Sequence, residues 1–308
     1  WLQFNARVLQ EAADQSVPLL ERLRFVGIFS NNLDEFFKVR YATVKRISEA
    51  GKGGRKALGV YRADELLELI TKEVIVQQAR SLEILKQIYT ELEQENIFVI
   101  SEKEIVHDEH KEFLEEFFIE NVSPALMSIV LHDEIEIPRL KDSAAYLAVK
   151  LKINNTENQY ALIEIPRSID RFIVLPKVDE RDCIVFLDDL IRYNLDDIFD
   201  IFDYESIEAH MVKITRDAEL DIESDLGKSF LEKLSKSVKQ REDADPVRFV
   251  YDEEIADETL NFLMTKMGIE KNDSVIPGGR YHFRRDYMDF PSLGRRDLMY
   301  ERQKPSPI

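Results

Sequence analysis

Three consecutive polar residues, Ser30, Asn31 and Asn32, lie between two strongly apolar turns of a segment that otherwise has the pattern of a buried helix. Short polar side chains of this kind hydrogen-bond to nearby backbone groups, and they therefore favour helix ends and turns over helix interiors. An asparagine amide also both donates and accepts hydrogen bonds, which suits it to hold a ligand. We therefore expect this cluster either to cap a helix or to hold something.

Capping is the simpler of the two interpretations. Asn32 is followed three residues later by Glu35, which matches a capping box. In this interpretation the helix breaks near residues 30–32 and restarts with Asp34 and Glu35 in its first turn, where acidic residues are favourable. On residue types alone capping is favoured over ligand binding, because short motifs recur by chance.

A second candidate is a basic strip over residues 278–304, in which seven Lys and Arg residues stand against four acidic ones. Arg280, Arg284 and Arg285 are candidate contacts for phosphate or another anion, and His282 lies among them. The alternative is a solvated charged loop with internal salt bridges. For His282 a structural hydrogen bond is the favoured interpretation.

The other residues that could carry chemistry do not form a recognisable site. His107 and His110 supply at most half of a metal site, since no cysteine or carboxylate pattern completes it. The acidic pairs Asp188–Asp189 and Asp196–Asp197 are interpreted as a solvated helix face, because apolar residues alternate with them. No GxxxxGK[ST] loop, GxGxxG loop or Ser-His-Asp arrangement occurs in the sequence. We therefore expect no catalytic residue and no metal site in this chain.

The composition is that of a folded, acidic protein. With 308 residues, 44% of them hydrophobic, the chain can bury real cores and carries a soft expectation of two domains. Its net charge of −18 argues against nonspecific binding to nucleic acid or to an anionic membrane. The single cysteine, Cys183, suits a reducing compartment, and no apolar run approaches transmembrane length. We expect a cytoplasmic protein without membrane insertion.

Residues 1–96 predict an elongated antiparallel helical bundle. We expect one helix over residues 2–13 and a second that begins near Pro18 and ends near residue 49. Glycines at 51, 53 and 54 should end the second helix. A third helix over residues 63–95, with apolar residues stepping by threes and fours, should fold back against the second.

After residue 96 the pattern becomes that of an α+β head domain with antiparallel hairpins, over residues 97–297. β-like runs cover residues 145–153 and 160–165, and the Asn-rich loop between them predicts a hairpin. The charged, proline-containing residues 298–308 are expected to be a linker. The predicted fold is therefore multidomain, α followed by α+β. The remaining expected elements are strands over 98–100, 172–175 and 247–251 and helices over 109–119, 187–199, 224–239 and 257–267.

Four separated matches, in one order along the chain, resemble the bacterial polyphosphate kinase family, the ATP-dependent type with a phosphohistidine intermediate. The resemblance covers essentially all 308 residues. The chain departs from the usual family wording after GGRYH, where Phe283, Arg284 and Arg285 follow directly. The matching segments are WLQFNARVLQEAAD (1–14) with VPLLERLRFVGIFSNNLDEFFKVR (17–40), TRDAELD (215–221), DPVRFVYD (245–252) and VIPGGRYHFRRDYMDFPSLGR (275–295).

The resemblance implies the N-terminal and head portion of an enzyme that transfers the ATP γ-phosphate to a histidine and then to a growing polyphosphate chain. The reactive histidine, the Mg²⁺ ligands and most phosphate-binding arginines would lie in a catalytic half absent from this chain, which alone would be inactive. The family's contact to the ATP base falls on Asn32 and, less securely, on Asn31. The implied partners are ATP or ADP, polyphosphate and a second copy joined through the head domain, with no nucleic acid.

Two further hypotheses belong to another class. The chain could be a free-standing assembly module that dimerises and has no nucleotide contact. It could also be a regulatory anion sensor that uses Arg280, Arg284 and Arg285.

Overall fold

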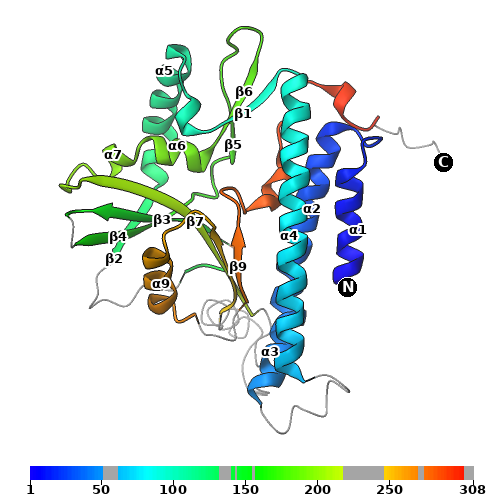
Figure 1. Ribbon diagram of the computed structural model, residues 1–308. Coiled ribbons are helices and arrows are strands. Elements are labelled where there is room, and N and C mark those ends of the chain that lie inside the picture. Colours follow the sequence, from blue (N-terminus) through cyan, green and yellow to red (C-terminus); the bar gives the residue numbers. More distant parts are fainter. Residues whose placement is uncertain are drawn as a thin grey trace, which may run out of the picture.

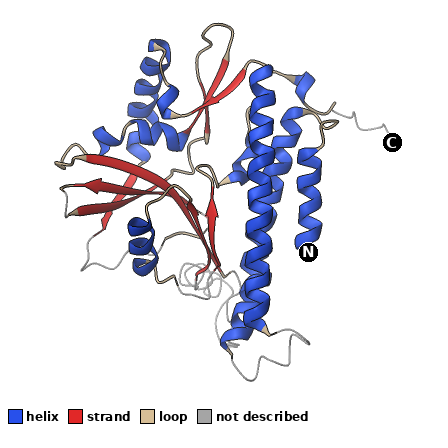
Figure 2. Cartoon of the chain, in the orientation of Figure 1, coloured by secondary structure: helices blue, strands red, loops and turns tan. Residues whose placement is uncertain are grey.

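A helical layer packs along one side of a mixed α+β head (Figures 1 and 2). The computed structural model describes residues 1–50, 62–131, 140–142, 144–154, 157–217, 246–269 and 274–301. The predicted glycine turn at 51–54, the predicted helix over 224–239 and most of the predicted linker lie outside these residues. The predicted class, a helical N-terminal part followed by an α+β head, is confirmed.

The helical layer is an antiparallel bundle built around one long helix. α4 has 32 residues, and α1, α2 and α3 pack along it. A π-helical turn, η1, joins α2 to α3, so that the chain is helical without interruption from Leu19 to Glu49. The elements are α1 (Leu2–Ala13), α2 (Leu19–Phe36), η1 (Phe37–Tyr41), α3 (Ala42–Glu49) and α4 (Ala63–Gln94).

The head contains a six-stranded sheet in the order β2-β4-β3-β7-β8-β9. All neighbouring pairs are antiparallel except β8 and β9, which run parallel. The predicted hairpin is β3–β4, in register from Tyr146 opposite Glu164 to Lys152 opposite Asn158. The strands of the six-stranded sheet are β2 (Met127–Leu131), β3 (Ala145–Lys152), β4 (Asn158–Glu164), β7 (Ser206–Arg216), β8 (Pro246–Asp252) and β9 (Ser274–Gly278).

A second, three-stranded sheet in the order β1-β6-β5 lies between α5 and the helical layer. β1 follows α4 directly and pairs in parallel with β6. The predicted helix over 187–199 is divided at Asn194 into two short helices. The elements are β1 (Ile97–Ile100), β5 (Phe172–Val174), β6 (Asp182–Phe186), α5 (Asp108–Phe117), α6 (Leu187–Tyr193), α7 (Leu195–Ile198) and α9 (Asp257–Lys266), with short turns η3 (Glu102–Glu104), η4 (Phe118–Val122), η5 (Ser123–Ala125), η6 (Arg284–Asp289) and η7 (Arg296–Leu298).

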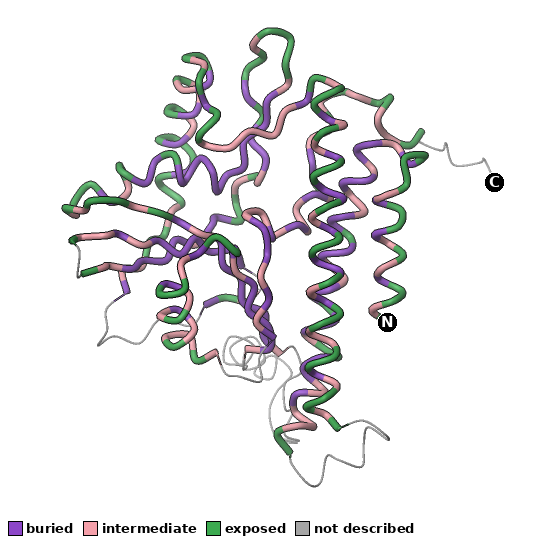
Figure 3. The backbone as a smooth tube through the Cα atoms, in the orientation of Figure 1, coloured by how far each residue is buried: buried purple, intermediate pink, exposed green. Residues whose placement is uncertain are grey.

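One hydrophobic core spans the helical layer and the head. Leu23, Phe29 and Ile88 of the helices belong to the same buried cluster as Val250 of β8 and Ile276 of β9. Figure 3 shows buried backbone on both sides of this junction. The strands of the head therefore fix the position of the helices. The division of the chain into two domains at residue 96 stays a prediction.

A buried ion cluster crosses the same junction. The carboxylate of Asp34, on α2, accepts hydrogen bonds from Lys213 Nζ of β7 at 2.7 and 2.6 Å and from the guanidinium of Arg248 of β8. Each of these three residues is 2% exposed. Arg248 also lies over the ring of Phe37 at 4.5 Å and donates to Thr215 at 3.2 Å.

The two cations change the titration of this carboxyl group. Burial alone would raise the pKa of Asp34, but Lys213 and Arg248 hold that pKa at about 2, below the ordinary 3.8. Burial lowers the pKa of Lys213 to about 8, although Asp34 acts against the change. Both groups are therefore charged at neutral pH.

We predict that Asp34→Asn destabilises the protein by about 3–5 kcal/mol, because it leaves two buried cations without a carboxylate. Urea unfolding of the 308-residue protein measures the change. Glu68→Gln on the exposed face of α4, where Glu68 pairs with Lys72 in solvent, is the control and should stay within about 0.5 kcal/mol. A loss below about 1 kcal/mol in Asp34→Asn would contradict the role given to this cluster.

We also predict that the stability lost in Asp34→Asn depends on pH. Because the pKa of Asp34 is about 2 in the folded protein and 3.8 unperturbed, its stabilisation is complete above pH 4 and is lost as the pH falls through 2. The stability gap between the unaltered protein and Asp34→Asn should therefore narrow by about 2 kcal/mol between pH 5 and pH 2. Unfolding curves of both proteins across this range give the gap, and a constant gap would contradict the assignment.

Candidate functional site

Ser30, Asn31 and Asn32 lie inside an unbroken α-helix, so the predicted helix break and the predicted capping box are wrong. Three consecutive polar residues point in three directions on a helix, and each finds its own surroundings. Ser30 is 5% exposed, whereas Asn31 and Asn32 are partly exposed. The irregular turn lies five residues further on, at η1.

Asn32 belongs to a strip that runs along α2 into η1, which we call the α2 strip. Its members, Ile28, Asn32 and Glu35 of α2 and Val39 of η1, recur at the spacing of one helix face. Ile28 is 36% and Val39 is 38% exposed, and Glu35 is also exposed. Other parts of α2 pack against α1, α4 and the head. Both residues of α2 that are classed as exposed, Ile28 and Glu35, lie on this strip, so a ligand can reach it.

Aromatic residues border the α2 strip on the side of α1. The ring of Trp1 stacks on Phe36 with centroids 5.0 Å apart, and the Arg40 guanidinium lies 5.5 Å from the Trp1 centroid. Trp1 remains 40% exposed. The site thus offers a planar aromatic face beside an amide.

The head borders the other side of α2 through η6. Here Gly27 allows the backbone of η6 to approach α2 closely, since a Cβ on Gly27 would lie 2.7 Å from the backbone nitrogen of Met288. Glycine is therefore required for this contact.

The side chain of Asn32 is hydrogen-bonded to a second asparagine, Asn5 of α1. Its Nδ2 donates to Oδ1 of Asn5 at 3.0 Å, and Asn5 Nδ2 donates to the carbonyl oxygen of Phe29 at 3.1 Å. Asn5 is completely buried. Asn31 forms no side-chain hydrogen bond with any residue that the structure describes. The site can therefore bind through an amide and apolar surface, but it presents no nucleophile.

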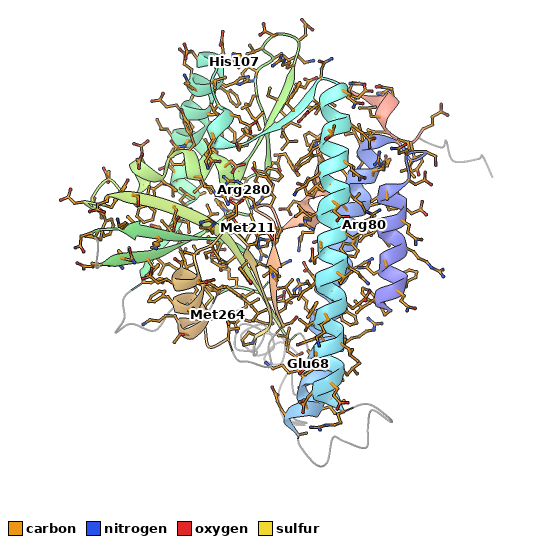
Figure 4. The ribbon with its side chains drawn as sticks, in the orientation of Figure 1. Glu68, Arg80, His107, Met211, Met264 and Arg280 are labelled. Atoms are coloured by element: carbon orange, nitrogen blue, oxygen red, sulfur yellow. The ribbon has the colours of Figure 1, made fainter. Side chains whose placement is uncertain are left out.

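The basic strip supplies mainly internal contacts. Arg280 donates to Asp189 at 2.8 Å and also pairs with Glu102 of η3. Figure 4 places Arg280 in the middle of the molecule. Arg284 is 2% exposed and donates to the backbone and side-chain oxygens of Gln78 at 3.2 and 3.1 Å. Anion binding by these arginines stays a prediction, and both are already engaged within the fold.

His282 and Arg285 differ in exposure. His282 is 4% exposed, and its Nδ1 lies 3.0 Å from the carbonyl oxygen of Gly279, the structural bond favoured from the sequence. Burial lowers the pKa of His282 to about 3, so the ring is neutral at physiological pH. The side chain of Arg285 is 42% exposed and lies 3.9 Å from Asp286. Of the four candidates, Arg285 has the most accessible charge.

The prediction that Asp188 and Asp189 form a solvated face is wrong. Both side chains are fully buried, and burial raises the pKa of Asp189 although Arg192 and Arg280 act against this. Arg192 donates to Asp189 at 2.8 Å. Arg171 donates to Asp188 at 2.9 Å. The alternating leucines had suggested one apolar face, but the acids of this short helix face Arg192 of the same helix and arginines from other segments, Arg171 and Arg280.

A cavity of about 460 Å³ lies between η6 and the segment 165–174. Burial raises the pKa of Asp286 in its wall to about 6. Its charged lining is balanced, which argues against a simple anion site. The charged residues that line it are Arg167, Arg171, Arg285, Asp170, Asp286 and Asp289.

Among the residues that the structure describes, no three His, Cys, Asp or Glu side chains converge as a metal site would require. Likewise, no helix in the described ranges combines the length and the apolar character needed to cross a membrane.

Family models match most of the chain. One described as the polyphosphate kinase N-terminal domain matches residues 1–100, and one described as the polyphosphate kinase middle domain matches residues 109–290. A polyphosphate kinase of Vibrio parahaemolyticus is 43% identical over 321 residues, which cover 100% of this chain and 44% of that protein. A polyphosphate kinase of Escherichia coli K12 is 39% identical over 323 residues, with the same coverage.

The fold agrees with a solved relative. The crystal structure of polyphosphate kinase from Porphyromonas gingivalis superimposes with a TM-score of 0.80 at 29% identity, over 99% of this chain and 42% of that one. The chain thus spans less than half the length of the relatives it matches. It belongs to the polyphosphate kinase family, of which it carries the N-terminal and middle domains.

Proposed function

We propose that this chain is the nucleotide-side scaffold of an enzyme that uses ATP to extend polyphosphate, and that the α2 strip contacts the ATP base. The relatives named polyphosphate kinase are more than twice as long, so the remaining part of such an enzyme would supply the reactive centre. The observation that carries the proposal is Asn32, a partly exposed amide on an unbroken helix, with the exposed apolar side chains of Ile28 one turn before it and Val39 two turns after it.

The chemistry of the α2 strip suits a base better than a phosphate. An amide matches the edge of adenine, which places an amino donor beside a ring-nitrogen acceptor. The partly exposed ring of Trp1 and the aliphatic side chains of Ile28 and Val39 offer flat apolar surface. Glu35 on the same strip would repel a phosphate chain.

The proposal gives this chain no step in the transfer itself. We assign the Mg²⁺ ligands and the phosphohistidine to the remainder of the enzyme, since phosphoryl transfer needs a phosphate clamp, metal ligands and a nucleophile in one place. Arg285, which is half-exposed at the border of η6, is the residue we would assign to a passing phosphate chain. Cytoplasmic location is part of the same proposal.

We also propose that the head joins two copies of the protein. β2 is an edge strand of the six-stranded sheet, and its Met127 is 55% exposed. Ile119, in the nearby turn η4, is 62% exposed. An uncovered strand edge with apolar neighbours favours association. The alternative function is a module without nucleotide contact. An assembly module would use this same surface, an anion sensor would use Arg280, Arg284 and Arg285, and both would leave Asn32 without a ligand.

We predict that the 308-residue chain alone does not synthesise polyphosphate, because it lacks the groups that phosphoryl transfer requires in one place. Incubation with ATP and Mg²⁺, followed by electrophoresis of any polyphosphate, is the measurement. The full-length protein that contains this chain is the positive control. Synthesis by the chain alone would show that the reactive centre has been placed wrongly.

We predict that Asn32→Ala in the full-length protein raises KM for ATP several-fold with kcat little changed. The expectation follows if the base is bound equally in the ground state and the transition state. Steady-state kinetics separate the two constants.

Asn121→Ala is a matched control, since Asn121 is an exposed asparagine on η4 whose amide donates to Phe117. It should change neither constant. If Asn32→Ala also changed neither, the assembly-module hypothesis would be favoured instead.

A further inference from the structure

The amide of Asn32 is held in one orientation by a buried relay. Asn5 of α1 lies beneath it and is completely buried. Asn5 contacts the carbonyl oxygen of Phe29 at 3.1 Å on one side and Asn32 at 3.0 Å on the other. These are the two polar contacts that the described structure gives to the Asn5 side chain.

The direction of each hydrogen bond follows from the backbone carbonyl. The oxygen of Phe29 can only accept, so the atom of Asn5 that faces it must be the nitrogen Nδ2. The oxygen Oδ1 of Asn5 is then the atom that faces Asn32, and it too can only accept. The atom of Asn32 that contacts Asn5 must therefore be its nitrogen. The hydrogen-bond network thus assigns the amide nitrogen and oxygen of Asn32, which the shape of an amide alone does not.

This relay leaves the oxygen of Asn32 turned away from Asn5. In the ranges that the structure describes, no hydrogen bond reaches this Oδ1. Asn5 uses one of the two hydrogens on Nδ2, and the other hydrogen remains available. The strip thus presents an acceptor and one neighbouring donor in a fixed order.

We propose that Asn5 is a positioning residue that fixes the amide of Asn32 with its oxygen outward, and that this orientation makes the site select adenine over guanine. The inference rests on the base contact proposed above and adds to it the source of base specificity.

The two purines differ at the position that such an amide reads. Adenine carries an amino donor at C6, which an outward oxygen accepts, and ring nitrogens that accept from the remaining N–H. Guanine carries a carbonyl oxygen at C6, which would face the amide oxygen as a second acceptor. An amide free to turn would accommodate both bases, whereas one held by Asn5 accommodates adenine.

The test compares ATP with GTP in the full-length protein. In Asn5→Ala the amide of Asn32 is free to turn, so the ratio of kcat/KM for ATP to kcat/KM for GTP should fall on the order of ten-fold. KM for ATP should rise with kcat little changed. The ratio does not depend on how much of the variant is folded, so a purely structural effect of the substitution leaves it unchanged.

Two further variants isolate the direction of the hydrogen bond. Asn5→Asp keeps an oxygen that accepts from Asn32, and it should therefore preserve the ATP preference although a buried acid lowers stability. Asn194→Ala removes another buried asparagine, whose amide donates to the carbonyl oxygen of Leu190 at 2.8 Å between α6 and α7. It should lower stability and leave the ratio unchanged.

The outcomes separate this inference from the proposed function. An unchanged ratio in Asn5→Ala, or an equal loss of preference in Asn5→Asp, overturns the positioning role while the base contact stands. If Asn32→Ala changes neither KM for ATP nor the ratio, the base contact itself fails and the positioning role fails with it. Trp1 is the one tryptophan of these 308 residues and stacks on Phe36, one turn from Asn32, so its fluorescence in the 308-residue chain gives a readout of ATP and GTP binding without turnover.

Discussion

The carboxylate of Asp34, held between two cations that come from neighbouring strands, fixes the rotation of α2 about its own axis. Lys213 of β7 donates to both carboxylate oxygens and Arg248 of β8 donates to Oδ1, and all three residues are buried. A buried carboxylate cannot turn toward solvent without a large desolvation penalty for its partners. Once this face of the helix is set against the sheet, the positions of all other side chains on α2 follow from the helical repeat.

The remaining faces of α2 are used in turn. Gly27, two turns before Asp34 on the same side, admits the backbone of η6. Phe29 and Leu33 enter the shared core, and Asn32 meets Asn5 on α1. The exposed residues of α2, Ile28 and Glu35, lie on the α2 strip. The polar residues Asp34 and Asn32 are therefore not flaws in an apolar pattern, because Asp34 is satisfied by the head and Asn32 by α1.

The sequence predicted the elements whose pattern is local. The long amphipathic helix α4 and the β3–β4 hairpin were found within one or two residues, since their apolar spacing is regular. β7 was missed because its sequence, SIEAHMVKITR, includes charged residues that are buried by partners elsewhere in the chain, as Lys213 is by Asp34. β9 was missed because proline and glycine are unusual in a strand.

The candidate site was predicted only in part, for the same reason. Asn32 was identified through the family resemblance, whereas residue types alone favoured a helix cap. Its partner Asn5 was not identified, because nothing in a single sequence indicates that residues 27 positions apart share a hydrogen bond. Asp188 and Asp189 were assigned to solvent because two of the arginines that bury them, Arg171 and Arg280, lie on separate segments. Local pattern predicts which face of an element is apolar, but it does not predict which charges meet across elements.

The distribution of buried cations explains how so acidic a chain can belong to a family named for a polyanion. Arg22, Lys213, Arg248 and Arg284 are each 2% exposed and hold elements together. A cation that is surrounded by its own fold contributes little to an external phosphate, since its field is largely neutralised by the partner beside it. With a net charge of −18, the surface of this part is unsuited to attract a phosphate chain over long distances. Recognition of ATP here would therefore depend on the uncharged end of the nucleotide, and the α2 strip has the amide and apolar surface that such recognition requires.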